Sequence, residues 1–170
     1  DGSDGMLFEM EILYYSDRTV DGRPEGLKRR PNKVLDTDFG DMGSDKEAYR
    51  WNYLIQNHRA EDDYSDLMAM VRTFGLSGDA FASQIGQVLD VDQWVRLFAC
   101  QSLCAVGDTY NQSHPHNLKL YVRPGDGRVE ALPWDTDRAF SASATGSPYG
   151  SSGSQLQKIL AIPAYRRLFQ

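Results

Sequence analysis

The sequence predicts a mixed α+β fold that is mainly helical, with one strand before the helices and a β-hairpin after them. Two observations indicate this class. Apolar and charged residues alternate near the N-terminus and again after residue 115, as in strands, whereas apolar residues recur at helical spacing between residues 44 and 106. The 170 residues, 41% of them hydrophobic and 25% charged, fit one globular domain or a large part of one.

The first predicted element is a strand over Met6–Tyr15, where apolar residues such as Phe8 alternate with acidic residues such as Glu9. Residues 16–43 contain several glycines and prolines and few apolar runs, so they predict a loop region with one short strand at Val34–Leu35. The chain begins without Met, and nothing near its start resembles a signal peptide, so we expect a segment of a longer protein.

A series of helices is predicted from residue 44 onward. Ser44-Asp45-Lys46-Glu47 has the spacing of a capping box, which begins a helix by satisfying free backbone N–H groups. Apolar residues then recur at helical spacing through Ala48–His58 and again through Tyr64–Phe74, and this pattern predicts two amphipathic helices.

Two more helices are predicted before residue 107. One begins after Ser77 and extends to Leu89. Asp90 with Gln93 offers a second cap, and the segment Trp94–Val106 that follows is apolar around most of its circumference. Such a helix belongs in the core.

The hairpin is the clearest local prediction. Two alternating segments, His116–Arg123 and Arg128–Trp134, flank a Pro-Gly-Asp-Gly turn, so they should pair as antiparallel strands. Residues 141–154 are rich in Ser and Gly and predict a mobile loop. A short helix over Gln155–Leu160 is expected after it.

Composition excludes several classes of protein. Because 24 acidic residues outnumber 18 Lys and Arg, the formal net charge is −6, and we expect no nucleic acid or anionic lipid as partner. No apolar run reaches the ~18 residues of a membrane span, so none is expected. Cys100 and Cys104 lie four positions apart, a spacing that rarely suits a disulfide, and we expect two buried thiols.

Oxygen-bearing side chains flank the hairpin. Asp108 follows the core helix, Asn117 lies at the start of the first hairpin strand, and Asp135 and Asp137 follow the second strand. Since a tight turn joins the two strands, their outer ends meet, and Asn117 should lie near Asp135. An amide with one or two carboxylates suits Mg²⁺ or Mn²⁺, and Asp108 could accept a proton from an attacking hydroxyl. This pattern predicts phosphoryl transfer.

The order of these residues is that of protein kinases, but the spacing differs. Asp108 and Asn117 are farther apart than in the H-R-D-x-x-x-x-N pattern, and the His-Arg-Asp triplet is absent, which excludes an ordinary eukaryotic-type kinase. Asp38-Phe39-Gly40 spells the kinase D-F-G triplet. It precedes Asp108, whereas the kinase triplet follows the catalytic aspartate, so we interpret the match as coincidental.

At these residues the sequence resembles the kinase-like family of spore-coat protein H, CotH. The resemblance extends over most of the chain. The residues that carry it are Asp92-Gln93-Trp94, Gly107-Asp108, His116-Asn117-Leu118-Lys119-Leu120-Tyr121 and Pro133-Trp134-Asp135-Thr136-Asp137, followed by Phe140.

The resemblance implies an atypical protein-kinase fold. Residues 1–43 would then hold the end of the N-lobe, and residues 44–170 a mainly helical C-lobe with its active-site hairpin at 116–134. It implies ATP with Mg²⁺ or Mn²⁺ as cofactors, and transfer to Ser of a protein substrate, including autophosphorylation. It also implies a secreted or cell-surface location.

The resemblance assigns roles to four residues. Asp108 would be the catalytic aspartate, and Asn117 and Asp135 would be metal ligands. Asp137 would be a second carboxylate ligand or a structural partner. The cofactor-binding lysine is expected outside this chain, because the lysines near the start lie in loop or helix-start contexts, and the isolated segment is therefore expected to be inactive. Those lysines are Lys28, Lys33 and Lys46.

Three alternatives stay open. The first is a secreted, non-catalytic metal-binding or surface-interaction module that keeps the kinase-like fold. The second is a structural Ca²⁺ site that combines Asp135 and Asp137 with the Asp62-Asp63 pair. The third is a transition-metal site in which His114 and His116 join Asp135.

Overall fold

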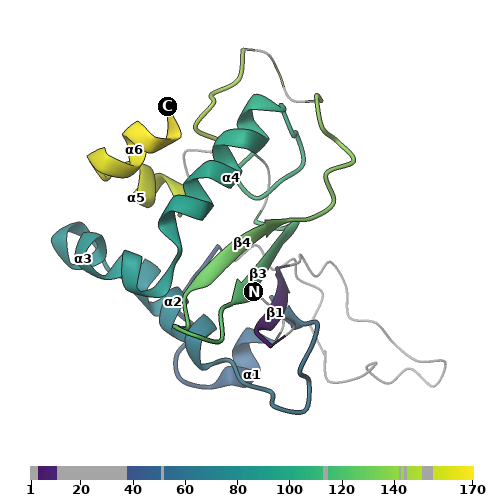
Figure 1. Ribbon diagram of the computed structural model, residues 1–170, viewed down its shortest axis with the longest axis vertical. Helices are drawn as coiled ribbons and strands as arrows, with labels where there is room; N and C mark the ends of the chain where they lie inside the picture. The colour runs from purple at the N-terminus through teal and green to yellow at the C-terminus, as the bar shows by residue number, and fades with distance from the viewer. Residues whose placement is uncertain are drawn as a thin grey trace.

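The computed structural model describes residues 4–10, 38–50, 52–112, 115–141, 143, 145–150 and 155–170. These residues form six helices and one four-stranded antiparallel sheet (Figure 1), which confirms the α+β class. Among them, no helix combines the length and apolarity needed to cross a bilayer. The strands are β1 (Met6–Met10), β2 (Tyr53–Ile55), β3 (Leu118–Val122) and β4 (Val129–Pro133).

The N-terminal strand lies inside the sheet, whose order is β2-β1-β3-β4. Phe8 of β1 pairs with Ile55 of β2 on one side and with Leu120 of β3 on the other. The predicted hairpin is confirmed, because β3 pairs with β4 from Leu118 opposite Pro133 onward. The first strand is confirmed over residues 6–10. Its predicted continuation over 11–15 and the strand at Val34–Leu35 lie outside the described residues.

Helices cover one side of the sheet (Figure 1). α2 and α4 contact β4, α3 packs on α2, and α6 packs on α4 and α5. The helices predicted after Tyr64, after Ser77 and before Val106 are confirmed, and so is the helix near Gln155. α6, a short helix that begins at a proline, was not predicted from the sequence. The helices are α1 (Lys46–Tyr49), α2 (Ser65–Gly75), α3 (Gly78–Val88), α4 (Val91–Leu103), α5 (Leu156–Leu160) and α6 (Pro163–Phe169).

The predicted helix over 48–58 is wrong. α1 has only four residues, and Asp45 caps it instead of Ser44, since its Oδ1 accepts a hydrogen bond from the Glu47 N–H at 3.0 Å. The chain then turns into β2, whose Tyr53 is fully buried and pairs with Met10. Pairing with β1 satisfies the backbone of this segment, so tertiary structure overrides the helical spacing.

An aromatic cluster fills the centre of the molecule around Phe39, which is 1% exposed. Its ring centroid lies 4.8 Å from that of Phe74, 5.2 Å from Tyr110 and 5.7 Å from Trp94. These partners come from α2, from the loop after α4 and from α4 itself. The Asp38-Phe39-Gly40 segment therefore anchors separate parts of the fold to one another.

Asp38 extends this anchoring through hydrogen bonds. Its Oδ1 accepts from the Tyr110 hydroxyl at 2.6 Å, and its Oδ2 accepts from the Gln155 backbone N–H at 2.6 Å. Burial and the nearby Asp38 carboxylate raise the pKa of Tyr110 well above its ordinary value, so this phenol stays a donor. Asp38 thus links the loop after α4 to the start of α5.

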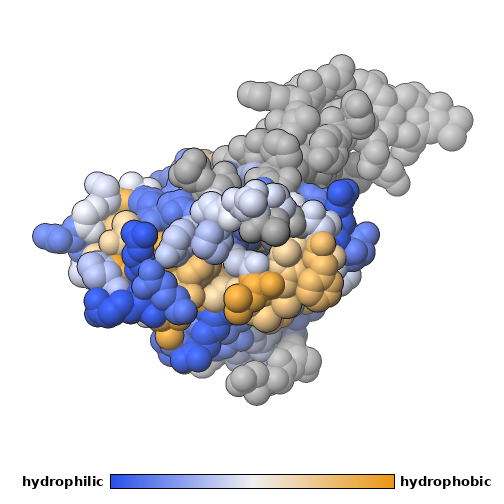
Figure 2. Space-filling model, turned by 90° about the horizontal axis from the view of Figure 1, so that it is seen from above, coloured by the Kyte–Doolittle hydropathy of each residue, from blue (hydrophilic) through white to orange (hydrophobic). Residues whose placement is uncertain are grey.

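The expectation of two buried thiols is wrong. Both cysteines are free, but Cys100 is exposed and Cys104 is half-exposed. α4 buries the face that contains Trp94 and Phe98, and Cys100 lies on the outward face. The helix is thus amphipathic, not buried on all sides. Figure 2 views the molecule from the end where α4 terminates, and an apolar area is visible there.

Acid is expected to weaken an ion-pair network at α1. Hydrogen bonds from Arg50 and Lys46 lower the pKa of Asp62 from 3.8 to about 2. Because the folded-state pKa lies below the unfolded-state value, the network stabilises the fold fully above about pH 4 and loses its effect between about pH 4 and pH 2. Urea unfolding of Asp62→Asn and of the native sequence should therefore differ at pH 6 and converge near pH 2. A gap that stays constant with pH would contradict this assignment.

Candidate functional site

The site begins where α4 ends. After Leu103 the chain enters Ala105, whose φ of 48° is in the left-handed region, and Val106 donates its N–H to the Gln101 carbonyl at 3.0 Å. This closed turn stops the helix, and Gly107 and Asp108 follow it. The Asp108 side chain is 37% exposed, so a ligand can reach it.

Two side chains from the mouth of the hairpin hold the Asp108 segment. The Asn117 amide nitrogen donates to the Asp108 backbone carbonyl at 2.9 Å. His116 Nε2 lies 3.2 Å from Asp108 Oδ1. Asn117 is only 5% exposed, and His116 is also buried. Since the amide nitrogen of Asn117 is used, its Oδ1 is the atom that remains for a ligand.

Asn117 and Asp135 mark the same end of the hairpin. Leu118 and Pro133 form the last register pair, so Asn117 comes just before β3 and Asp135 lies two residues after β4. Their φ angles are 53° and 49°. Asn and Asp occupy this left-handed region more readily than most other residues. The hairpin geometry that the sequence predicted is thus present, and both residues occupy conformations common at functional sites.

The segment after β4 is fixed to the end of α4. Gly107 donates its N–H to the Arg138 carbonyl at 3.1 Å, and Phe140 donates to the Cys104 carbonyl at 2.8 Å. These bonds place the chain around Asp137 beside the chain around Asp108. Phe140 itself has a left-handed φ of 61° and is 80% exposed.

The structure brings the predicted residues together in part. Asp108, Asn117 and His116 are in direct contact, whereas the Asp135 and Asp137 side chains are exposed. Across the described ranges, no group of three or more His, Cys, Asp or Glu side chains is placed to hold a metal ion. A metal ion at this site would therefore be held by fewer than three such side chains, together with ligands of other kinds such as an amide oxygen.

The lack of a three-residue metal-binding group among the described residues counts against the structural Ca²⁺ site. Asp62 binds Arg50 and Lys46, and Asp63 accepts the Ser65 backbone N–H at 2.9 Å, before the first turn of α2. Both carboxylates are thus engaged. The transition-metal hypothesis stays a prediction, because His114 lies outside the described residues; of its other members, His116 pairs with Asp108.

The remaining oxygen donors are of the chemical type that would suit a magnesium ion. Mg²⁺ prefers oxygen ligands, keeps several waters and is commonly held by one or two carboxylates together with substrate phosphates. Asn117 Oδ1 and the exposed Asp135 carboxylate supply two such oxygens at one end of the hairpin. A three-carboxylate cluster is therefore not required.

Lys119 on β3 is named in the sequence only as part of the family resemblance, without contacts of its own. Lys119 Nζ lies 3.1 Å from the centroid of the Trp134 ring and 3.8 Å from Glu9 Oε2. Strand alternation places Lys119 on the face of the sheet opposite the core, a signal that was available in the sequence. Lys46, by contrast, is bound to Asp62. The role of His116 as the partner of Asp108 was not predicted from the sequence.

Protein kinases hold their metal ions with an Asp and an Asn side chain and use a further Asp to accept the proton of the substrate hydroxyl. The family model described as CotH kinase protein matches residues 15–170. The chain therefore belongs to the CotH kinase family, and the resemblance noted in the sequence is confirmed. Comparison with curated proteins gives no match.

Proposed function

We propose that this chain forms the hairpin-bearing part of an atypical protein kinase that transfers the γ-phosphoryl group of ATP to Ser of a protein substrate. The observation that supports the proposal most is the contact set around Asp108. Asn117 binds its backbone and His116 its carboxylate, at the end of the hairpin that leads to Asp135. The kinase-like fold, with the N-lobe ending near residue 43, and a location outside the cytosol are part of the same proposal.

Each side chain would have a distinct role. Asp108 accepts the proton of the Ser hydroxyl as that oxygen bonds to the γ-phosphorus and ADP leaves. His116 keeps the Asp108 carboxylate oriented. Asn117 and Asp135, with Asp137 as a further candidate, would hold Mg²⁺ or Mn²⁺, which neutralises phosphate charge when bound. The bond from Asn117 to the Asp108 backbone fixes the distance between the base and the metal-binding amide.

Loss of ligand stabilisation in Asp135→Asn tests the proposal. Mg²⁺ with ATP near 100 times its Kd should raise the unfolding free energy of the native chain by about 2.7 kcal/mol, or the melting temperature by about 5–10 °C. The variant should lose most of this shift because it lacks the negative charge. Asn is chosen over Ala because it tolerates the left-handed backbone at this position.

Asp92→Asn is the matched control. Asp92 is on the exposed face of α4 and pairs only with Arg96 in the described structure, at 2.6 Å, so this variant should keep the full shift. An equal shift in Asp135→Asn and in the native chain would show that this carboxylate binds no metal.

A non-catalytic module is the second candidate function. It is favoured by the loop between Asp108 and Asn117, which is longer than in the kinase pattern and changes where Asp108 lies relative to the metal-binding amide. Such a module would show the metal-dependent shift without any phosphate transfer by the longer protein. Transfer of labelled phosphate from ATP to protein would contradict it.

A further inference from the structure

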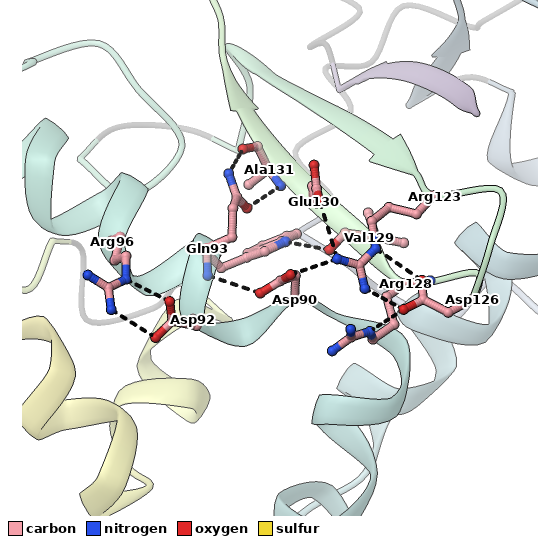
Figure 3. Close-up of polar contacts among 11 residues, drawn as sticks. Asp90, Asp92, Gln93, Arg96, Arg123, Asp126, Arg128, Val129, Glu130 and Ala131 are labelled. Carbon is pink, nitrogen blue, oxygen red and sulfur yellow. Dashed lines mark hydrogen bonds and ion pairs between the residues drawn. The ribbon is translucent and has the colours of Figure 1, made fainter. Parts of the chain in front are cut away.

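The outer edge of the sheet at β4 is closed by a side chain. Among the described residues, β4 is the last strand of the sheet, and its outer edge meets only an isolated parallel bridge between Leu89 and Val129. The Gln93 amide nitrogen donates to the Ala131 carbonyl, and Gln93 Oε1 accepts from the Ala131 N–H at 2.9 Å (Figure 3). One side chain of α4 thus makes both hydrogen bonds that a neighbouring strand would make to that residue.

The first turn of α4 fixes the start of the same strand. The Trp94 indole N–H and the Asp90 backbone N–H both donate to the Val129 carbonyl, at 2.9 and 3.1 Å. Asp90 also pairs with Arg123 at 2.9 Å (Figure 3).

Because of these contacts, the cap predicted from Asp90 and Gln93 makes only one of the two hydrogen bonds of a capping box. Asp90 Oδ1 accepts from the Gln93 backbone N–H at 3.2 Å, as the motif requires. The reciprocal bond from the Gln93 side chain to the Asp90 N–H is absent, because that N–H is bound to Val129. Gln93 is thereby directed toward the hairpin instead of its own helix.

Gln93 connects the two elements that end at the site. Asp108 follows the end of α4 by five residues, and Asp135 follows the end of β4 by two. Ala131 lies in β4, four positions before Asp135 in the sequence. A change in how β4 lies against α4 therefore changes where Asp135 lies relative to Asp108.

We infer that Gln93 is a positioning residue for the site, holding β4 so that Asp135 and Asn117 face one bound divalent cation. The inference rests on the proposed function. Removal of a hydrogen bond to a metal ligand commonly weakens metal affinity by about 10–100-fold, and Gln93 acts one step farther away, through the strand that leads to Asp135. Gln93 itself touches neither the cation nor the nucleotide in this scheme.

Mn²⁺ affinity of the full chain, measured by electron paramagnetic resonance with and without ATP, tests the inference. Gln93→Met keeps the length of the side chain but removes both hydrogen bonds, and we expect its Mn²⁺ affinity to fall by about 10-fold or more. Gln93→Glu keeps the acceptor for the Ala131 N–H and should bind with intermediate affinity. Hydrogen exchange of the Ala131 amide should quicken in the order Gln, Glu, Met.

The Trp94→Phe variant distinguishes an effect on the position of the site residues from an effect on the stability of the fold. It removes one of the two donors to the Val129 carbonyl but keeps the Asp90 N–H bond and both Gln93 bonds, so β4 stays in place. The variant should lower the melting temperature while leaving Mn²⁺ affinity within about twofold of the native value. Native affinity in a folded Gln93→Met variant, together with lost binding in Asp135→Asn, overturns the inference and leaves the proposed function standing. Absence of Mn²⁺ binding by the native chain overturns both.

Discussion

Replacing Phe39 with Ala is expected to cost about 3–5 kcal/mol of unfolding free energy, the largest stability effect of any single change considered for this chain. The side chain is 1% exposed and its ring contacts those of Phe74, Trp94 and Tyr110. Truncation leaves a cavity among large rings that cannot easily collapse to fill it. Since a domain is typically stable by only about 5–15 kcal/mol, a large part of the total would be lost.

Urea unfolding measures this effect, and Phe140→Ala is its matched control. Phe140 is also a phenylalanine with positive φ, but it is 80% exposed, so its truncation should change stability by less than about 0.5 kcal/mol. Phe39→Leu should lie between the two. A loss below about 1 kcal/mol in Phe39→Ala would mean that the aromatic cluster does not hold the fold together.

Asp108→Asn is expected to lower kcat of the longer protein by roughly 10²–10⁴-fold, which is the usual contribution of a general base. The melting temperature should hardly change. Asn117 binds the backbone carbonyl of Asp108, which the substitution keeps, and an Asn side chain can still accept from His116. The Asp108→Asn substitution therefore removes the proton acceptor without disturbing the structure around it.

Steady-state phosphate transfer at saturating ATP measures the effect, with KM recorded alongside kcat. KM for ATP should stay close to the native value, because Asp108 is assigned to the acceptor hydroxyl and not to the nucleotide. Asp79→Asn, an exposed position on α3, is the control and should be fully active. Native kcat in Asp108→Asn would remove the proposed base from the mechanism.

Sequence patterns predicted the parts of the fold that local rules determine. Helices α2 to α4 and the hairpin follow from spacing, capping and turn residues that act within about ten positions. The pattern failed at β2, because only contact with β1 makes Tyr53–Ile55 a strand. It failed again at Cys100, since a helix that reads as apolar all round can still turn one face outward.

The candidate site, too, could be predicted from the sequence only in part. Hairpin register alone predicted that Asn117 and Asp135 share one end of the hairpin. The contacts of Asp108 with His116, and of Gln93 with Ala131, could not be predicted, because each joins segments whose approach depends on the whole fold. The sequence predicts Gln93 as part of a cap within its own helix. In the structure its side chain makes a tertiary contact with the Ala131 backbone instead.

The pairing of β1 with β3 has a consequence for folding. Phe8 and its partner Leu120 are 112 positions apart, so closing this contact requires a long loop. At synthesis rates of roughly 5–20 residues per second, β1 leaves the ribosome some 6–22 s before its partner does. Although β2 is made earlier and can pair with one edge of β1, the other edge of this apolar strand waits unpaired during that time and is exposed to wrong partners. The sheet that carries the hairpin is thus completed late, and the proposed site cannot assemble until nearly the whole chain has been made.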